Sequence, residues 1–329
     1  MSGFPGRPKG KSFAAVLWFP FFFAAAFAVM FLGAFASPTP HDMSLGVTGT
    51  NAHVSAVDKA VRQAAGNGVE IRQLPDRQEA ERLVRQGELA GAYVAEDPQN
   101  PELLVASASS AVRADYLKEV AGRETAQQVS GTPATTVDLV PAARGDVSGV
   151  GLFFYAMPLL LVGMITSIVL LQAVTWTARK KAAAIAATGA FASVFVYTVA
   201  VSMDVVPAKP VLIVHAFLLT QAIGWLTTAV ALLAKHHFMP VAMTFVLILG
   251  IPTAGGSVPP DMLPAALGAL HQMLPFGQFI DLARSSAYFG GHDTVRPFLT
   301  LLGWLAAAAT LFAFAARRAN RSAQPSRAA

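Results

Sequence analysis

Residues 250–291 read GIPTAGGSVPPDMLPAALGALHQMLPFGQFIDLARSSAYFGG, and this stretch decides how the rest of the chain can be arranged. The apolar run before it, Phe238–Ile251, has about 14 residues, whereas a helix needs about 20 to cross a bilayer core. Two glycines and two prolines, which permit unusual backbone angles or lack an amide hydrogen, then interrupt it: Gly255, Gly256, Pro259 and Pro260. A continuous helix therefore cannot pass through this stretch.

Apolar character resumes in two pieces, Leu263–Leu274 and Phe276–Leu282, and each is too short to span a bilayer. The pattern predicts a broken hairpin that enters the membrane and returns to the same face, with its free backbone groups satisfied by protein or water. The alternative is a full helix, a surface turn and one amphipathic helix at the interface. Both arrangements remain open at this point.

Charged residues lie in or beside this hairpin. Asp281 and Arg284 are three residues apart, so on a helix they share a face and can pair. Irregular segments often line binding sites in membrane proteins. The candidate outer gate therefore consists of Asp261, Asp281 and Arg284 together with the two glycines and two prolines named above.

Composition bounds the class of protein. Of 329 residues, 54% are hydrophobic and 13% are charged, whereas a soluble domain has about 25% charged residues. The chain is therefore expected to be an integral membrane protein. Because cysteine is absent, disulfides, Cys-ligated metals and thiol nucleophiles are excluded.

The net charge of +5 does not indicate nucleic-acid binding. Acidic residues occur only between Asp42 and Asp293, so the basic excess belongs to the two tails and to short basic turns between apolar runs. Such an excess reports orientation in a membrane. We expect no nucleic acid among the partners of this chain, and we expect membrane lipids.

The first apolar run, Phe13–Ala36, follows Arg7, Lys9 and Lys11 and is long enough to span. Ala34, Phe35 and Ala36 resemble a signal-peptide cleavage site. A signal peptide has a hydrophobic region of only about 7 to 15 residues, so an uncleaved anchor is favoured.

Four later runs are also long enough to span: 150–176, 182–203, 210–234 and 297–316. With the first run and the broken Phe238 segment they make six spans. The predicted fold is a polytopic α-helical membrane protein with an extracytoplasmic α/β domain inserted between spans 1 and 2. Its parts are a cytoplasmic tail (1–12), a first span (13–36), the α/β domain (37–149), a five-span region with the broken hairpin (150–316) and a disordered cytoplasmic tail (317–329).

Lys and Arg near the span ends set the orientation. If the N-terminus is inside, most of them fall on the inner face: Arg7, Lys9, Lys11, Arg179, Lys180, Lys181, Lys235, Arg317, Arg318, Arg321 and Arg327. Outside the folded domain, the opposite face holds only Lys209, Arg284 and Arg296. We therefore expect a multi-pass protein with both termini cytoplasmic and with the α/β domain and the hairpin facing outward.

The segment 37–149 has the pattern of a small soluble domain in which strands and helices alternate. Strands are expected at 44–47, 69–74, 91–95, 103–106 and 135–140, and helices at 51–65, 76–86 and 110–129. This alternation predicts an α/β domain with a partly parallel sheet. Asp76 with Glu79 forms a capping box at one helix start. His41 and His53 stand alone, and no catalytic or metal-binding motif occurs in this segment.

Polar residues at membrane depth are costly and are functional candidates by default. The spans offer Gln172, His215 and Gln221. The two glutamines are predicted to hydrogen-bond between helices, and His215, about five residues inside its span, is expected at the interface. Because the predicted spans hold no buried acid, Lys or Arg, the sequence argues against a proton- or sodium-coupled transporter.

Two stretches resemble the ABC-2 type membrane subunits of ATP-driven exporters, particularly the YhgE/Pip-like branch. The first, DRQEAERLVRQGELAGAYVAEDP at 76–98, is similar to the family's outer-domain pattern through Glu79-Ala80, Gly87, Gly91 and Pro98. The second is the hairpin itself, in which a Gly-Gly and Pro-rich turn precedes "LP" and a later Leu-Arg pair precedes Gly-Gly. Here Ala283 separates Leu282 from Arg284.

The resemblance implies a permease-like subunit of an exporter in a bacterial plasma membrane, with an amphipathic or lipid-like substrate. It implies a homodimer or heterodimer and a separate cytoplasmic ATPase, so this chain itself is expected to be no enzyme and to hold no catalytic residue, cofactor or metal. The alternative is a non-transporting envelope protein of the same type, whose outer domain binds a surface or secreted partner. Very short turns around Arg179 and Lys235 leave little surface for an ATPase and keep this alternative open.

Overall fold

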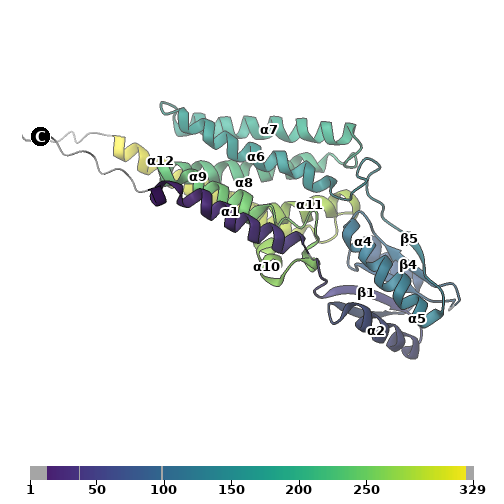
Figure 1. The fold of residues 1–329 in the computed structure, drawn as a ribbon. Coiled ribbons are helices and arrows are strands. Elements are labelled where there is room, and N and C mark those ends of the chain that lie inside the picture. The colour runs from purple at the N-terminus through teal and green to yellow at the C-terminus, as the bar shows by residue number, and fades with distance from the viewer. Residues whose placement is uncertain (1–12, 37, 98, 324–329) are drawn as a thin grey trace, which may run out of the picture.

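The computed structural model places an α/β domain at one end of a bundle of long apolar helices (Figure 1). It describes residues 13–36, 38–97 and 99–323. The predicted N-terminal tail, 1–12, and residues 324–329 of the predicted C-terminal tail lie outside these ranges. The two parts are therefore the extramembrane and membrane portions that the composition predicts.

Five helices in the described ranges are long and apolar enough to cross a membrane. They are α1 (Phe13–Phe35), α6 (Gly151–Gln172), α7 (Ala178–Ser202), α8 (Val211–Ala234) and α12 (Val295–Ala323). The chain is therefore a helical membrane protein. The five long predicted runs correspond to these helices, and the predicted broken segment corresponds to the shorter apolar stretch Phe238–Gly250. Helix α12 continues through residues 317–323 of the predicted disordered tail 317–329, because the Ala and Arg residues there favour helix and no proline occurs between Pro297 and Pro325.

Between α8 and the hairpin the chain runs along the bundle once more, in a segment that is not one continuous helix; this segment is called the broken passage. After α8 and a short 3-10 turn, η2 (Lys235–His237), α9 (Phe238–Met243) and the π-helical segment η3 (Thr244–Gly250) return toward the α/β domain. Residues 251–259 then complete the passage without helix, and nearly all of them are buried in protein. The six residues of α9 and the seven of η3 are too few to span, since the following Gly and Pro residues end the helix.

The hairpin follows as η4 (Pro260–Met262), α10 (Ala265–Met273) and α11 (Pro275–Tyr288). Its tip, at Leu274–Phe276, encloses a small apolar space with Leu160 and Ile223, which lie near the middle of α6 and α8. Its other end returns to the α/β domain, where Phe289 packs against the sheet. The hairpin thus enters the bundle and comes back to the same end, as the first of the two sequence-based arrangements predicts.

In its described residues the α/β domain contains five strands and five helical elements, three of which form one continuous run. The strands are β1 (Met43–Thr48), β2 (Val69–Leu74), β3 (Gly91–Val94), β4 (Glu102–Val105) and β5 (Thr135–Asp138). The helical elements are α2 (Asn51–Ala65), α3 (Arg77–Gln86), and a continuous run of α4 (Ala111–Leu117), the π-helical η1 (Lys118–Thr125) and α5 (Ala126–Ser130). The predicted elements are confirmed within a few residues. Asp76 caps α3 by accepting a hydrogen bond of 2.8 Å from the Glu79 amide.

The sheet is mixed, in the order β2-β1-β3-β4-β5. Among the described strands, β3 and β4 pair antiparallel, with Gly91 opposite Val105; β1 pairs in parallel with β2 and β3, and β4 with β5. This confirms the partly parallel sheet.

The domain's hydrophobic core extends into the hairpin. One face of the sheet packs in a single cluster with α2 and the α4–α5 run, and this cluster includes four hairpin residues: Val258, Met262, Leu263 and Leu267. The other face packs under α3 and receives Phe289. The α/β domain and the hairpin are therefore held together by shared burial of apolar surface, the main favourable term in folding.

The helices of the bundle pack closely through small residues. A Cβ on Gly163 of α6 would lie 2.9 Å from Ile223, and one on Gly189 of α7 would lie 2.2 Å from the Gln221 amide nitrogen. Between α6 and α8, the Ser167 hydroxyl lies 2.6 Å from that of Thr227 and 2.8 Å from that of Thr228. Small residues and neutral hydrogen bonds of this kind are the usual means of joining helices in a membrane.

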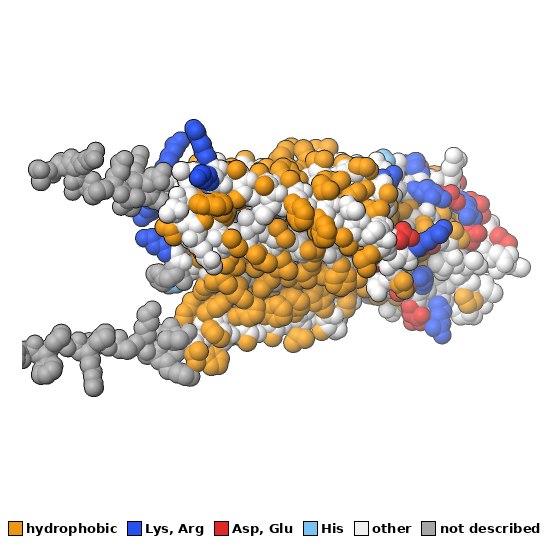
Figure 2. Space-filling view, turned by 90° about the horizontal axis from the view of Figure 1, so that it is seen from above, with side chains coloured by type: hydrophobic (Ala, Val, Ile, Leu, Met, Phe, Trp, Pro, Cys, Tyr) orange, Lys and Arg blue, Asp and Glu red, His pale blue; other side chains and the backbone are white. Residues whose placement is uncertain are grey.

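Charged side chains are distributed unevenly along the molecule. Figure 2 shows hydrophobic side chains over its middle, Lys and Arg side chains at the end of the bundle away from the α/β domain, and mixed charges on that domain. At the basic end, the Lys181 ammonium donates to the Leu170 carbonyl at 3.1 Å and so satisfies the C-terminus of α6. This distribution is the one expected for a protein that crosses a membrane.

Candidate functional site

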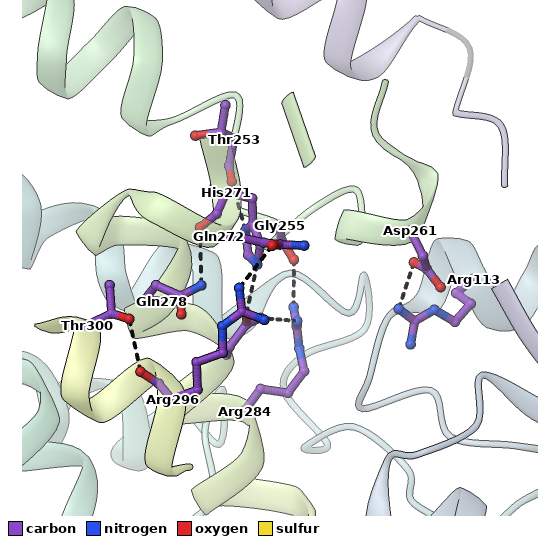
Figure 3. A network of polar contacts seen from close by, with 11 residues as sticks. Arg113, Thr253, Gly255, Asp261, His271, Gln272, Gln278, Arg284, Arg296 and Thr300 are labelled. Atoms are coloured by element: carbon purple, nitrogen blue, oxygen red, sulfur yellow. Dashed lines mark hydrogen bonds and ion pairs between the residues drawn. The ribbon is translucent and has the colours of Figure 1, made fainter. Parts of the chain in front are cut away.

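A pocket of about 320 Å³ lies where the α/β domain, the hairpin and the start of α12 meet. Eight charged or titratable side chains take part in its lining: Arg113, Asp261, His271, Asp281, Arg284, His292, Asp293 and Arg296. In Figure 3, His271, Arg284 and Arg296 come together from different elements, and the Arg113–Asp261 pair lies to one side of them. A volume of about 300 to 1,000 Å³ is typical of small-molecule sites.

His271 stands at the centre of this network and is only 2% exposed. Its Nδ1 lies 2.9 Å from the Thr253 carbonyl oxygen, and its Nε2 lies 2.7 Å from an Asp281 carboxylate oxygen. When Asp281 is ionised, both neighbours accept, so both ring nitrogens donate for the two hydrogen bonds to form together. The geometry therefore suits a doubly protonated, positively charged imidazole beside an ionised Asp281.

The electrostatics agree with this geometry. Burial lowers the pKa of His271, but the charge of Asp281 and the hydrogen bonds to Asp281 and Thr253 outweigh it, so the pKa lies above its ordinary value. For Asp281, burial raises the pKa, and the nearby His271 and Arg284 cations outweigh that effect and lower it. The pair is therefore ionised near pH 6.

Two glycines make room for the imidazole. A Cβ on Gly255 would lie 2.7 Å from the ring's Cε1, and a Cβ on Gly277 would lie 2.6 Å from its Nδ1. Gly255 also has φ +68°, a left-handed conformation that residues with a Cβ adopt at a cost. Gly255 and Gly277 are thus required by the position of His271.

Arg284 fixes the broken turn from the α11 side. Its Nη2 donates to the Gly255 carbonyl at 2.8 Å, and its Nη1 lies 3.7 Å from Asp281. The predicted Asp281–Arg284 pair is confirmed, but the shorter contact of Asp281 is to His271. The guanidinium therefore retains donors that face the pocket.

Arg113 connects the α/β domain with the hairpin. Its Nη2 lies 2.7 Å from an Asp261 carboxylate oxygen, and the two side chains are 17% and 22% exposed. Asp261 also accepts a backbone hydrogen bond from the His41 amide, in the segment between α1 and β1. Contacts from two distant segments thus converge on one residue of η4.

Arg296 enters from the first turn of α12. Its Nη2 donates to the Gln272 side-chain oxygen at 2.9 Å. No carboxylate in the described ranges forms an ion pair with it. Arg296 is therefore a cation with free donors at the pocket.

The structure brings together part of the predicted gate. Pro260, Asp261, Asp281 and Arg284 line the pocket. Gly255 supports it from behind, and Pro259 is buried just before η4. Gly256 faces Phe153 of α6, so its role is close packing away from the pocket.

The predicted intramembrane polar residues lie elsewhere. Gln221 donates to the Ile185 carbonyl of α7 at 3.2 Å, which confirms an interhelical hydrogen bond. Gln172 is exposed at the last residue of α6, so the same prediction stays untested for it. His215, the fifth residue of α8, is 5% exposed and is therefore enclosed by protein; its position at the interface stays a prediction.

Sequence reasoning missed His271, Arg113 and Arg296 as site residues. His271 and the adjacent Gln272 are polar residues in an otherwise apolar run, which was a usable signal of function. Arg113 is separated from Asp261 by 148 positions, and no local pattern reveals such a contact. The described residues contain no group of three or more His, Asp or Glu side chains placed to hold a metal ion.

No protein-family model matches this sequence, and comparisons with curated proteins and with solved structures give no match. The ABC-2 resemblance therefore stays a prediction from two stretches of sequence. What the site can do rests on its own chemistry. It offers guanidinium donors for an anion, and an imidazole that can release or take up a proton.

Proposed function

We propose that this chain is the permease-like membrane subunit of an ABC-2 type, ATP-driven exporter, acting on an amphipathic or lipid-like substrate in a bacterial plasma membrane. One observation supports the proposal above others: the broken passage formed by α9, η3 and residues 251–259, which ends at the polar pocket. Discontinuous helices are the typical site-forming elements of transporters.

The surroundings of this passage also suit an amphipathic substrate. Helix α1 packs against η3, yet little of its surface is buried. A helix held by so few contacts can move aside at small cost. A substrate could then pass between lipid and the broken segment while its polar part remains near the pocket.

The proposed orientation places the pocket outside and the basic end of the bundle in the cytoplasm. Labelling of introduced cysteines tests it, because the chain has no native cysteine. Lys209 and Lys180 are both exposed, at opposite ends of α7 and its loops. In intact cells, a membrane-impermeant maleimide is expected to label Lys209→Cys and not Lys180→Cys; the reverse pattern would invert the proposal.

The decisive experiment for transport is affinity purification of the full chain from its native host in a mild detergent. The proposal expects a separate subunit that hydrolyses ATP to copurify. Its hydrolysis rate should respond to the Gly255→Leu variant, which disrupts the turn while leaving the long helices intact. Purification of the chain without any ATPase would contradict the proposal.

A second candidate is a non-transporting envelope protein whose α/β domain binds a surface or secreted partner. The loops at the basic end favour it: α6 and α7 are joined by residues 173–177, and α8 and α9 by the three residues of η2. This leaves a small docking area for an ATPase. Recovery of envelope or secreted proteins alone in the same purification would support this second function.

A further inference from the structure

We infer that the pocket between the α/β domain and the hairpin binds the anionic head group of an amphiphile, a phosphate or carboxylate held by Arg284 and Arg296. The inference rests on the proposed function in taking this amphiphile to be the substrate. Its structural basis is independent, since it comes from the charges, contacts and borders of the pocket.

The carboxylates of the pocket are largely neutralised by other partners. Asp261 is bound by Arg113 at 2.7 Å, and Asp281 by the His271 imidazolium at 2.7 Å. Asp281 lies 3.7 Å from Arg284. The positive charge of Arg284 is therefore only partly offset.

Arg296 adds a second positive charge, because its hydrogen-bond partner is the neutral Gln272. Asp293, an exposed residue at the rim, supplies one negative charge nearby. With His271 protonated, the cations of the lining still outnumber its carboxylates. The pocket consequently favours an anion.

The two guanidinium groups are also placed to act together. Figure 3 shows them extending from α11 and from α12 toward the same region. Arg284 is held in place by the Gly255 carbonyl, and its side chain is 12% exposed. Planar guanidinium groups bind phosphate and carboxylate through paired hydrogen bonds, and a pre-positioned one loses little entropy on binding.

Apolar residues beside the pocket indicate an amphiphile and not a free anion. Met273, Val295 and Leu299 are 65%, 69% and 59% exposed. They directly adjoin Gln272 and Arg296 in the chain or on the helix, and the Trp304 indole fixes the end of α10 to α12 by donating to the Met273 carbonyl at 2.7 Å. An acyl chain leaving the pocket would cover this apolar border.

Native mass spectrometry of the purified full chain in a neutral maltoside detergent tests the inference. The probes are dioctanoyl phosphatidic acid, dioctanoyl phosphatidylcholine and inorganic phosphate. We expect saturable binding of phosphatidic acid, at least about tenfold weaker binding of phosphatidylcholine, and no displacement of phosphatidic acid by equimolar inorganic phosphate. Phosphate that competes equally would show a free-anion site, and equal binding of both lipids would exclude anion recognition; either result would overturn the inference.

Variants locate the site. Arg296→Gln removes an exposed guanidinium with one side-chain partner, and Gln272→Glu gives that guanidinium an internal carboxylate. Each is expected to weaken phosphatidic acid binding at least about tenfold, the effect of losing one charge-assisted hydrogen bond. Lys209→Gln removes one positive charge from the same end of the bundle outside the pocket and should leave binding unchanged. Unchanged binding in Arg296→Gln, or equal weakening in Lys209→Gln, would place the lipid elsewhere.

The two proposals can fail separately. If an ATPase copurifies but phosphatidic acid does not bind, the exporter stands and the head-group inference falls. If phosphatidic acid binds through Arg296 and no ATPase copurifies, the site stands and the exporter falls.

Discussion

The α6–α8 contact and the hairpin are both buried, but they are held together by different forces. Between α6 and α8, glycines bring the backbones together and neutral hydroxyls such as Ser167 form the hydrogen bonds. In the hairpin, a buried imidazolium, a carboxylate and a guanidinium join α10, α11 and the broken turn. The first contact does not depend on protonation, whereas the second requires charges, so a change in pH or the arrival of an anion acts on the hairpin alone.

The largest difference between the two regions should appear at Gly255. Gly255→Ala combines a positive φ, worth about 1–2 kcal/mol, with a collision against His271, worth about 1–3 kcal/mol, so we expect a loss of about 2–5 kcal/mol in unfolding free energy. The measurement is unfolding of the purified protein in mixed micelles.

Gly291→Ala is the matched control, because Gly291 has φ +83° and a Cβ there would meet nothing within 4 Å. Only the backbone cost of about 1–2 kcal/mol should remain. Equal losses for the two variants would show that His271 does not require the glycine.

The second-largest loss in unfolding free energy should follow from removing one member of the charged His271–Asp281 pair. His271→Leu leaves Asp281 without its shortest hydrogen bond and should cost about 1.5–3 kcal/mol at pH 6. Ser167→Ala in the bundle should cost about 0.6–1.7 kcal/mol. A double variant with Asp281→Asn should lose less than the sum of the two single losses, since the pair acts as one unit. Strict additivity would mean that the two side chains do not interact.

The pH dependence of stability sharpens the comparison. The pKa of His271 is raised on folding, so its contribution is complete below the unfolded value of about 6.5 and is lost as pH rises through the folded value. The pKa of Asp281 is lowered, so its contribution is complete above about 3.9 and is lost as pH falls through the folded value. We expect greatest stability between about pH 4 and 6.5.

The same titration can be repeated on two variants. Asp281→Asn should remove most of the decline between pH 6 and 9, and Ser167→Ala should leave the shape of the profile unchanged. A decline that persists in Asp281→Asn would assign it to another group.

The smallest effect distinguishes the two glutamines. Gln221→Leu removes an interhelical hydrogen bond and should cost about 0.6 kcal/mol, the average for such bonds in a membrane protein. Gln172→Leu, at the exposed end of α6, should change the unfolding free energy by less than that. Equal and measurable losses would show that Gln172 also joins helices.

Local features of the fold were predictable from the sequence. Apolar runs gave the five long helices, and alternation with turn residues gave the elements of the α/β domain, including the Asp76 cap. The Gly-Pro interruption predicted the hairpin. These features succeed because length, periodicity and capping act within a few neighbouring residues.

The site was predictable only in part, because its contacts connect distant segments. Asp281 and Arg284 share a helix turn and were recognised as a pair, whereas Arg113 contacts Asp261, which lies 148 positions later in the chain. His271 had no local partner to distinguish it from the other histidines. Its importance follows from the Thr253 carbonyl and Asp281, which the fold brings to opposite sides of its ring.

The shared core of the α/β domain sets an order of events during synthesis. Strands β1–β5 are complete by Asp138, but Val258, Met262, Leu263 and Leu267, which finish one side of their core, are translated more than a hundred positions later. While α6, α7 and α8 are synthesised, one apolar face of the domain therefore lacks these four side chains. The domain core can be completed only after the hairpin has been synthesised, so we expect a chain truncated before residue 258 to expose that face to chaperones and proteases.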